Sequence, residues 1–200
     1  MGKVFDHWET TDVKISDVSL ANYLDLATKM VPHTFGKMQE YPFQKARMSV
    51  VERLVNKVMR SGQGKRKLSG KYIRGRGSCG KKIQALKIVE KAFAIAERET
   101  KQNPVQVLVQ AIENSAPRED ITRIKRGGIS YTVAVDIAPM KRVDEALKNI
   151  ALAAFAQSFN SKTSAEQALA KELILAAKGD NTSFSIKRRD EVERIALSSR

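Results

Sequence analysis

The sequence predicts a mainly α-helical protein, a bundle of about six helices from which one β-hairpin protrudes. Two observations support this fold class. Apolar residues recur at helical spacing along most of the chain, which is typical of helices that bury one face. Between residues 129 and 137, in contrast, apolar and polar residues alternate strictly, as in a strand with one buried face.

The hairpin is expected within residues 116–142, which contain a proline near each end. Gly127 and Gly128 precede the alternating strand and can adopt the two positive φ angles of a type I′ turn. An isolated ribbon is marginal in water, so we expect the root of the hairpin to rest on the helices. Pairing outward from the turn predicts these opposing residues: Arg126 and Ile129, Lys125 and Ser130, Ile124 and Tyr131, Arg123 and Thr132, Thr122 and Val133.

The N-terminal quarter of the chain shows the weakest pattern. Residues 1–16 are polar and of mixed charge, and we interpret them as an arm that Trp8 anchors, either to the protein or to a partner. Leu20, Leu24 and Ala27 predict a short helix, for which Asp17 or Ser19 would be the N-cap. Residues 30–44 contain two prolines and a glycine, which indicates a loop.

A stronger helix is predicted from Arg47 to Gly62, because its apolar residues form one stripe and its basic residues lie outside that stripe. Residues 62–80 are polar, basic and rich in glycine, and we interpret them as a loop that stays flexible until it is bound. A further helix is predicted over residues 83–98. The next begins with Asn103 as N-cap and Pro104 at its first position.

The segment after Pro104 is apolar nearly all round and predicts a central helix, although its β-branched residues leave a strand possible. Beyond the hairpin, a long helix is expected from Met140 or Val143. Thr163 and Glu166 have capping-box spacing at the start of another helix, which ends at Gly179. Residues 185–200 are mildly amphipathic and predict a C-terminal tail helix that needs a partner surface. The whole chain, residues 1–200, is expected to form one domain.

The charge of the chain is strongly positive and unevenly distributed. Thirty-six Lys and Arg oppose 22 Asp and Glu, a net charge of +14. Residues 37–82 alone hold 14 basic and 2 acidic side chains. Such a basic block is typical of a polyanion-binding segment.

Composition limits the environment of the protein. A single cysteine, Cys79, cannot form an internal disulfide and suits a reducing compartment. No apolar run approaches the roughly 20 residues that span a bilayer. We therefore expect a soluble, cytoplasmic protein.

The sequence predicts neither catalysis nor a metal or cofactor site. Residues 75–82 match a phosphate-binding loop except at Lys82, where the magnesium ligand should be a hydroxyl, and no buried strand precedes them. A basic loop that contacts RNA phosphates is the better interpretation. His7 and His33 lack further ligands at suitable spacing, and Cys79 lacks a suitably spaced histidine. The acidic pairs Asp144-Glu145 and Asp190-Glu191 are expected at the surface, solvated or ion-paired.

Nucleic-acid binding is better supported. The basic helix at residues 47–60, the loop at 65–82 and the hairpin tip can together form one cationic surface. Aromatic residues make up 6% of the chain, so base stacking on a sheet is not indicated. We therefore expect recognition of the shape of a folded RNA.

Several motifs resemble those of one ribosomal family, the universal seventh protein of the small subunit, which older eukaryotic naming numbers fifth. Residues 12–15 and 51–54 are similar to its archaeal and eukaryotic branch. Nearly the whole chain takes part in the resemblance, which rests on residues 103–104, 107–109, 111–120, 122–123, 127–128, 134–136, 139, 141–143, 165–166, 169–170, 172–174, 176–179 and 186–194.

The resemblance implies a helical bundle with a protruding hairpin and binding to the 3′ major domain of small-subunit rRNA, where the family helps to nucleate the head. It also implies neighbouring ribosomal proteins as partners, and places the hairpin and the C-terminal helix near the tRNA exit site and the mRNA path. Residues 65–79 depart from the family as an insertion. Charge and resemblance together predict these RNA-binding residues: Lys45, Arg47, Arg53, Lys57, Arg60, Lys65, Arg66, Lys67, Lys81, Lys82, Arg118, Arg123, Lys125, Arg126, Arg142, Arg188 and Arg189.

One alternative stays open at this point. A free helical regulator that binds nucleic acid would show the same charge pattern. Such a regulator would not sediment with ribosomal subunits.

Overall fold

The computed structural model describes most of the chain. For residues 63–68 and 71–74 and for Arg126 it describes the backbone alone. The described residues are 3–27, 29–36, 41, 43–61, 63–68, 71–74 and 80–200.

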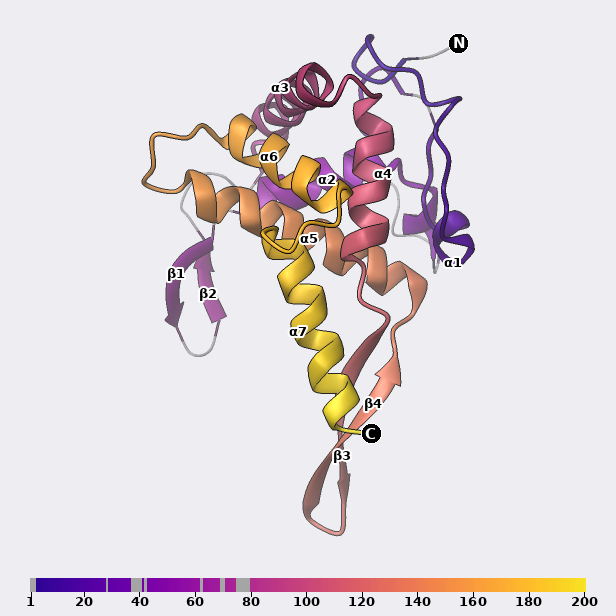
Figure 1. Cartoon of the computed structure of the whole chain (residues 1–200), viewed down its shortest axis with the longest axis vertical. Coiled ribbons are helices and arrows are strands. Elements are labelled where there is room, and N and C mark those ends of the chain that lie inside the picture. The colour runs from indigo at the N-terminus through magenta and orange to yellow at the C-terminus, as the bar shows by residue number, and fades with distance from the viewer. Residues whose placement is uncertain are drawn as a thin grey trace.

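Helices dominate the described part of the chain, as predicted, and two antiparallel ribbons accompany them (Figure 1). The helices are α1 (Val18–Ala21), the 3-10 helix η1 (Gln44–Arg47), α2 (Val50–Arg60), α3 (Lys82–Thr100), α4 (Pro104–Ser115), α5 (Pro139–Ser158), α6 (Ala165–Ala177) and α7 (Phe184–Ser198). The strands are β1 (Gln63–Leu68), β2 (Lys71–Arg74), β3 (Glu119–Arg126) and β4 (Ile129–Asp136).

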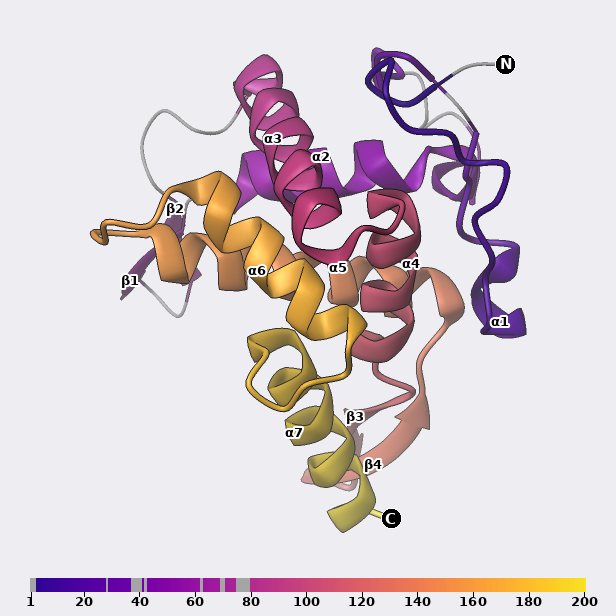
Figure 2. The same ribbon diagram turned by 45° about the horizontal axis from the view of Figure 1, so that its top comes forward.

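Helix α6 lies at the centre of the bundle, in contact with α3, α4 and α5. Helix α2 packs against α3 and α5 on the other side of the core, as Figures 1 and 2 show. The core contains side chains from all five of these helices, and its largest fully buried apolar members include Leu54, Phe93, Leu108, Leu147, Ile150, Leu169 and Leu173.

The predicted starts of the later helices are confirmed to within a few residues. Asn103 accepts a hydrogen bond from the Val105 amide, with Pro104 at the first helical position of α4. The capping box of α6 lies one residue later than predicted, because Ser164 and Gln167 exchange the two hydrogen bonds. Gly179 follows α6 at φ +69°, where its lack of a side chain avoids strain. Gly62, the predicted end of α2, lies outside the described residues.

The N-terminal arm is part of the core, which answers the question of what anchors Trp8. The Trp8 ring packs edge-on against Phe93 of α3, and its indole N–H donates to Glu97 Oε2 at 2.9 Å. Val4 is buried beside it. The arm therefore belongs to the bundle rather than to a partner.

The predicted helix around Leu20 to Ala27 was wrong in length, since α1 ends at Ala21. Asp17 does cap it, by accepting from the Ser19 amide. Beyond α1 the chain turns at Asn22 and Tyr23, and the Val50 amide donates to the Asp25 carbonyl at 2.9 Å. Tertiary hydrogen bonds to the start of α2 thus replace the next helical turn.

The hairpin β3–β4 has the predicted register at all five predicted pairs, from Arg126 opposite Ile129 to Thr122 opposite Val133, and the same register continues to Glu119 opposite Asp136. Gly127 and Gly128 have φ angles of +56° and +83°, as a type I′ turn requires. The prediction that its apolar face is buried was wrong: the exposed fractions of Ile129, Tyr131, Val133 and Val135 are 59%, 50%, 40% and 38%. The ribbon extends beyond the bundle (Figure 1), so these four side chains stay partly exposed to solvent although α7 packs against its root.

Helix α7 lies along the root of the hairpin, as both views show. The Arg118 amide donates to Glu193 at 2.9 Å, and Arg200 pairs with Glu119. At its other end α7 is joined to α6 by Glu172, a fully buried carboxylate that accepts from Ser183 and Ser185. The tail helix thus finds its partner surface within the protein.

The second ribbon, β1–β2, was not predicted. Leu68 pairs with Lys71 and Gln63 with Arg74, within the segment that we interpreted as an unstructured loop. A two-stranded ribbon needs backbone hydrogen bonds rather than an apolar face, so the polar composition of residues 65–79 did not exclude it. It occupies a different side of the bundle from β3–β4 (Figure 1).

Candidate nucleic-acid interface

The basic block of the sequence becomes a cationic surface where η1, α2 and the start of α3 meet α5. Lys45 and Arg47 lie on η1; Arg53, Lys57 and Arg60 follow at helical spacing on α2. The contact between α2 and α5 then brings an acidic residue of α5 into the middle of these cations.

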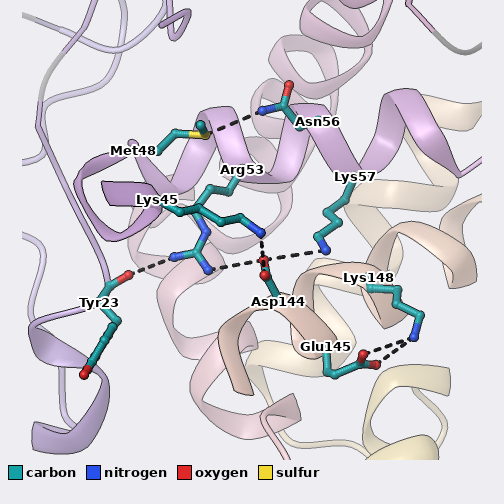
Figure 3. Close-up of polar contacts among 9 residues, drawn as sticks. All are labelled: Tyr23, Lys45, Met48, Arg53, Asn56, Lys57, Asp144, Glu145 and Lys148. Atoms are coloured by element: carbon teal, nitrogen blue, oxygen red, sulfur yellow. Dashed lines mark hydrogen bonds and ion pairs between the residues drawn. The ribbon is translucent and has the colours of Figure 1, made fainter. Parts of the chain in front are cut away.

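That residue is Asp144, whose carboxylate binds three cations at once (Figure 3). The Arg53 Nη2 atom lies 3.3 Å from Oδ1, the Lys57 Nζ atom lies 3.6 Å from the same oxygen, and Lys45 pairs with Oδ2. Arg53 also donates from Nη1 to the Tyr23 carbonyl at 2.9 Å. One negative charge therefore holds three positive ones together.

Burial and charge act on these groups in opposite directions. Burial alone would raise the pKa of Asp144, but the hydrogen bond from Lys45 and the charges of Lys57 and Arg53 lower it below its ordinary value. Burial lowers the pKa of Lys57, and the charge of Lys45 lowers it further, against the attraction of Asp144. Burial likewise lowers the pKa of Arg53. With three cations on one carboxylate, the cluster carries a net positive charge.

A second carboxylate joins α2 to α3 and to the loop before η1. Glu52 is 1% exposed, and its Oε1 accepts from Lys82 Nζ at 2.6 Å. The same oxygen accepts from the amide and the hydroxyl of Thr34, both at 2.9 Å. Lys82 is thereby held at the edge of the cationic surface.

These groups line one pocket of about 490 Å³ between the loop, α2 and α5. Five cationic side chains face two carboxylates in its wall, an excess of three positive charges. Its ionic residues are Lys45, Glu52, Arg53, Lys57, Arg60, Lys82 and Asp144, and the loop contributes His33, Thr34 and Gly36. Such a pocket attracts anions.

The structure separates the predicted RNA-binding residues into two groups. The first group is exposed, and within the described part of the chain no carboxylate lies at ion-pair distance from its members: Arg47, Arg60, Lys81, Arg118, Arg123 and Lys125. Members of the second group bind carboxylates of the protein: Lys45, Arg53, Lys57, Lys82, Arg142, Arg188 and Arg189.

Arg53 and Arg142 are the most buried of the second group, with 1% and 8% of the side chain exposed. Arg142 donates to Asp17 and Ser19 and so ties α5 to the N-terminal segment. Arg189 donates to the Asn114 carbonyl at the end of α4. These guanidinium groups hold elements of the fold together.

Four predicted residues cannot be placed at side-chain level. Lys65, Arg66 and Lys67 belong to β1, and Arg126 ends β3, but their side chains lie outside the described residues. Residues 75–79 of the phosphate-loop-like segment, including Cys79, also lie outside them.

Sequence reasoning missed the residues that organise the site. Asp144 was expected at the surface, solvated or ion-paired; the structure shows it half-buried and ion-paired to three cations. Glu52 and the loop residues around His33 were not assigned any role. No local signal marks Asp144 or Glu52, because each acts on residues 18 or more positions away in the chain.

The described ranges contain no cluster of three or more potential metal-ligating side chains. None of their helices combines the length and the apolar character that crossing a membrane requires. His7 packs against Trp8, and His33 Nδ1 accepts the Phe35 amide at 2.8 Å.

The chain is similar to known proteins over nearly its whole length. A family described as ribosomal protein S7p/S5e matches residues 22–200. The chain is 48% identical over 199 residues to small ribosomal subunit protein uS7 of Methanothermobacter thermautotrophicus, covering 100% of both chains. It is 46% identical over 197 residues to the protein of the same name from Methanosphaera stadtmanae, covering 98% of each.

Proposed function

Because the chain belongs to the ribosomal protein S7p/S5e family, we propose that it is a structural constituent of the small ribosomal subunit and binds its rRNA. The match of the family over residues 22–200 carries this proposal. The net charge of +14 and the exposed cations around the pocket and the hairpin support it, since phosphate contacts supply most of the affinity for RNA.

We place the RNA contacts on the exposed and half-buried cations rather than on the two most buried arginines. Arg53 and Arg142 serve this interface by positioning α2 and α5. The proposed contacts are Lys45, Arg47, Lys57, Arg60, Lys81, Lys82, Arg118, Arg123, Lys125, Arg188 and Arg189, together with Lys65, Arg66, Lys67 and Arg126 on the basis of charge alone.

The location of the chain within the small subunit is proposed from the resemblance of its motifs. We propose that the chain binds the 3′ major domain of the rRNA, helps to nucleate the head and contacts neighbouring ribosomal proteins. We also place the hairpin and α7 near the mRNA path and exit-site tRNA. The packing of α7 against the hairpin root supports a shared role of these two elements (Figure 1).

We also propose that the protein acts without catalysis. Lys82 pairs with Glu52 at 2.6 Å, so its ammonium group serves the fold and the cationic pocket. ATP hydrolysis by the purified chain that is lost in Lys81→Ala would contradict this.

Sedimentation tests the function directly. A tagged chain should sediment with small ribosomal subunits at low salt and dissociate only as the salt concentration rises, because released counterions weaken phosphate contacts. A chain that remains in the light fractions at every salt concentration would contradict the proposal and favour a free nucleic-acid-binding regulator. If the chain does sediment with small subunits, chemical footprinting of the bound rRNA would locate the rRNA helices that it contacts.

A further inference from the structure

The loop before η1 exposes an aromatic residue in a strained conformation. Phe35 is 81% exposed, and its φ of +54° lies in the left-handed region that favours glycine. Both features are unfavourable. The left-handed conformation strains the backbone, as is often found at functional sites, and the exposed ring lacks the stabilisation that burial would give it. A residue that combines them indicates a binding role.

The Phe35 ring is held in place by its neighbours. It packs on the His33 ring, with 4.3 Å between the centroids and 36° between the planes. The Phe35 amide donates to His33 Nδ1, and Thr34 is fixed to the buried Glu52 by two hydrogen bonds. The ring is therefore presented by a loop that is anchored to α2.

The loop forms one side of the cationic pocket. Both neighbours of Phe35, Thr34 and Gly36, line it together with His33. The rest of the lining includes Lys45, Lys57 and Arg60, and its positive charges outnumber its negative charges. A flat aromatic surface and an anion-attracting hollow thus lie next to each other.

We propose that this combination binds one unpaired nucleotide of RNA, with its base stacked on Phe35 and its phosphate in the pocket beside Lys57 and Arg60. The inference rests on the proposed function, because it specifies how the same surface recognises RNA. Aromatic rings and cations side by side are the elements by which proteins bind unstacked bases. A base within a duplex keeps its faces covered, so the site selects a bulged or looped nucleotide.

The ligand chemistry separates this proposal from an apolar protein contact. A protein partner that covers Phe35 needs only its apolar surface, which leucine also supplies, and gains nothing from Lys57 and Arg60. A nucleotide needs both the planar ring and the positive charge. The Phe35→Leu and Phe35→Tyr variants therefore distinguish the two partners.

The test measures binding of rRNA fragments and of single-stranded, duplex and mononucleotide probes. Phe35→Ala should weaken the affinity for single-stranded RNA about tenfold, whereas Phe35→Tyr should restore it and Phe35→Leu should not. Phe159→Ala is the matched control, since Phe159 is 54% exposed at the far end of α5. Duplex binding should not change.

Fluorescence provides a second readout. The native Trp8 is 6% exposed and so is shielded from RNA. The additional emission of Phe35→Trp therefore reports binding at the loop. Single-stranded RNA should quench this emission, and Phe159→Trp should not respond. Quenching by mononucleotide at the same concentration as RNA would identify a free-nucleotide site instead and overturn the assignment to RNA.

The outcomes separate the two proposals. If wild-type protein binds no rRNA, the proposed function fails. If wild-type protein binds rRNA, and Phe35→Ala or Phe35→Leu binds single-stranded RNA as tightly, the nucleotide site alone is wrong.

Discussion

Asp144 organises the cationic surface at the level of a single residue. Three side chains from η1 and α2 converge on its carboxylate, and one of them, Arg53, is almost fully buried. A buried guanidinium without a counter-charge is costly, so this carboxylate stabilises the contact between α2 and α5 (Figure 3). It also keeps Lys45 and Lys57 at the wall of the pocket.

Replacing Asp144 by asparagine should therefore destabilise the protein at neutral pH. We expect the free energy of unfolding to fall by about 3 kcal/mol, because Arg53 loses its counter-charge. Since the pKa of Asp144 is lowered by folding, its contribution is complete above the ordinary aspartate value and is lost as the pH falls through the folded value. The difference between wild type and variant should accordingly shrink in acid.

Urea unfolding at pH 7 and at several acidic pH values measures this difference. Glu145→Gln is the control, because Glu145 pairs with Lys148 on its own helix and is a third exposed. A loss at pH 7 no greater than that of Glu145→Gln would show that the three cations do not depend on Asp144.

At the scale of the element, the hairpin carries charge away from the bundle. Its register is set by the two glycines of the turn, and its root is held by α7. The tip itself projects away from the helices (Figure 1). Substitutions at the tip of this ribbon should therefore change RNA affinity with little effect on the free energy of unfolding.

Changing Lys125 and Arg126 together to alanine should lower rRNA affinity with little loss of stability. Each lost phosphate contact reduces the slope of log K against log salt by about 1, so the double variant should reduce it by up to about 2. Filter binding over a range of salt concentrations measures the slope. An unchanged slope would mean that the tip does not contact RNA.

A matched control removes two exposed charges elsewhere. Lys162→Ala combined with Lys171→Ala changes the net charge equally, on the loop before α6 and on α6 itself. An equal decrease in slope from this pair would attribute the effect to net charge rather than to the tip.

For the whole molecule, the N-terminal arm and the bundle share one core. Val4 and Trp8 are buried with Phe93 of α3, and Arg142 ties α5 to Asp17 and Ser19. We therefore expect the arm to unfold together with the helices.

Trp8 makes this expectation testable, since it is the one tryptophan of the chain. Its fluorescence and the far-UV circular dichroism of the helices should follow the same urea transition, as in a two-state domain. Trp8→Phe removes the indole and so identifies its contribution to the fluorescence change. A fluorescence change that precedes the loss of helix would show that the arm detaches first.

Local signals in the sequence determined the helices after residue 82 and the hairpin. Caps, prolines and glycines act on their immediate neighbours, so Asn103, Pro104 and Gly127-Gly128 could be interpreted without the fold. The basic block likewise predicted a polyanion partner, because net charge does not depend on conformation. Period-two alternation fixed the faces of the hairpin.

Tertiary structure alone decided what those faces and charges meet. No pattern indicates that the apolar hairpin face stays exposed, that α1 ends at Ala21, or that α7 finds its partner on β3. Asp144 and Glu52 select their cations from distant elements, and Phe35 acquires its role from the pocket beside it. Local propensity is a property of neighbours in the chain, whereas burial, ion pairing and pocket shape depend on elements that only packing brings together.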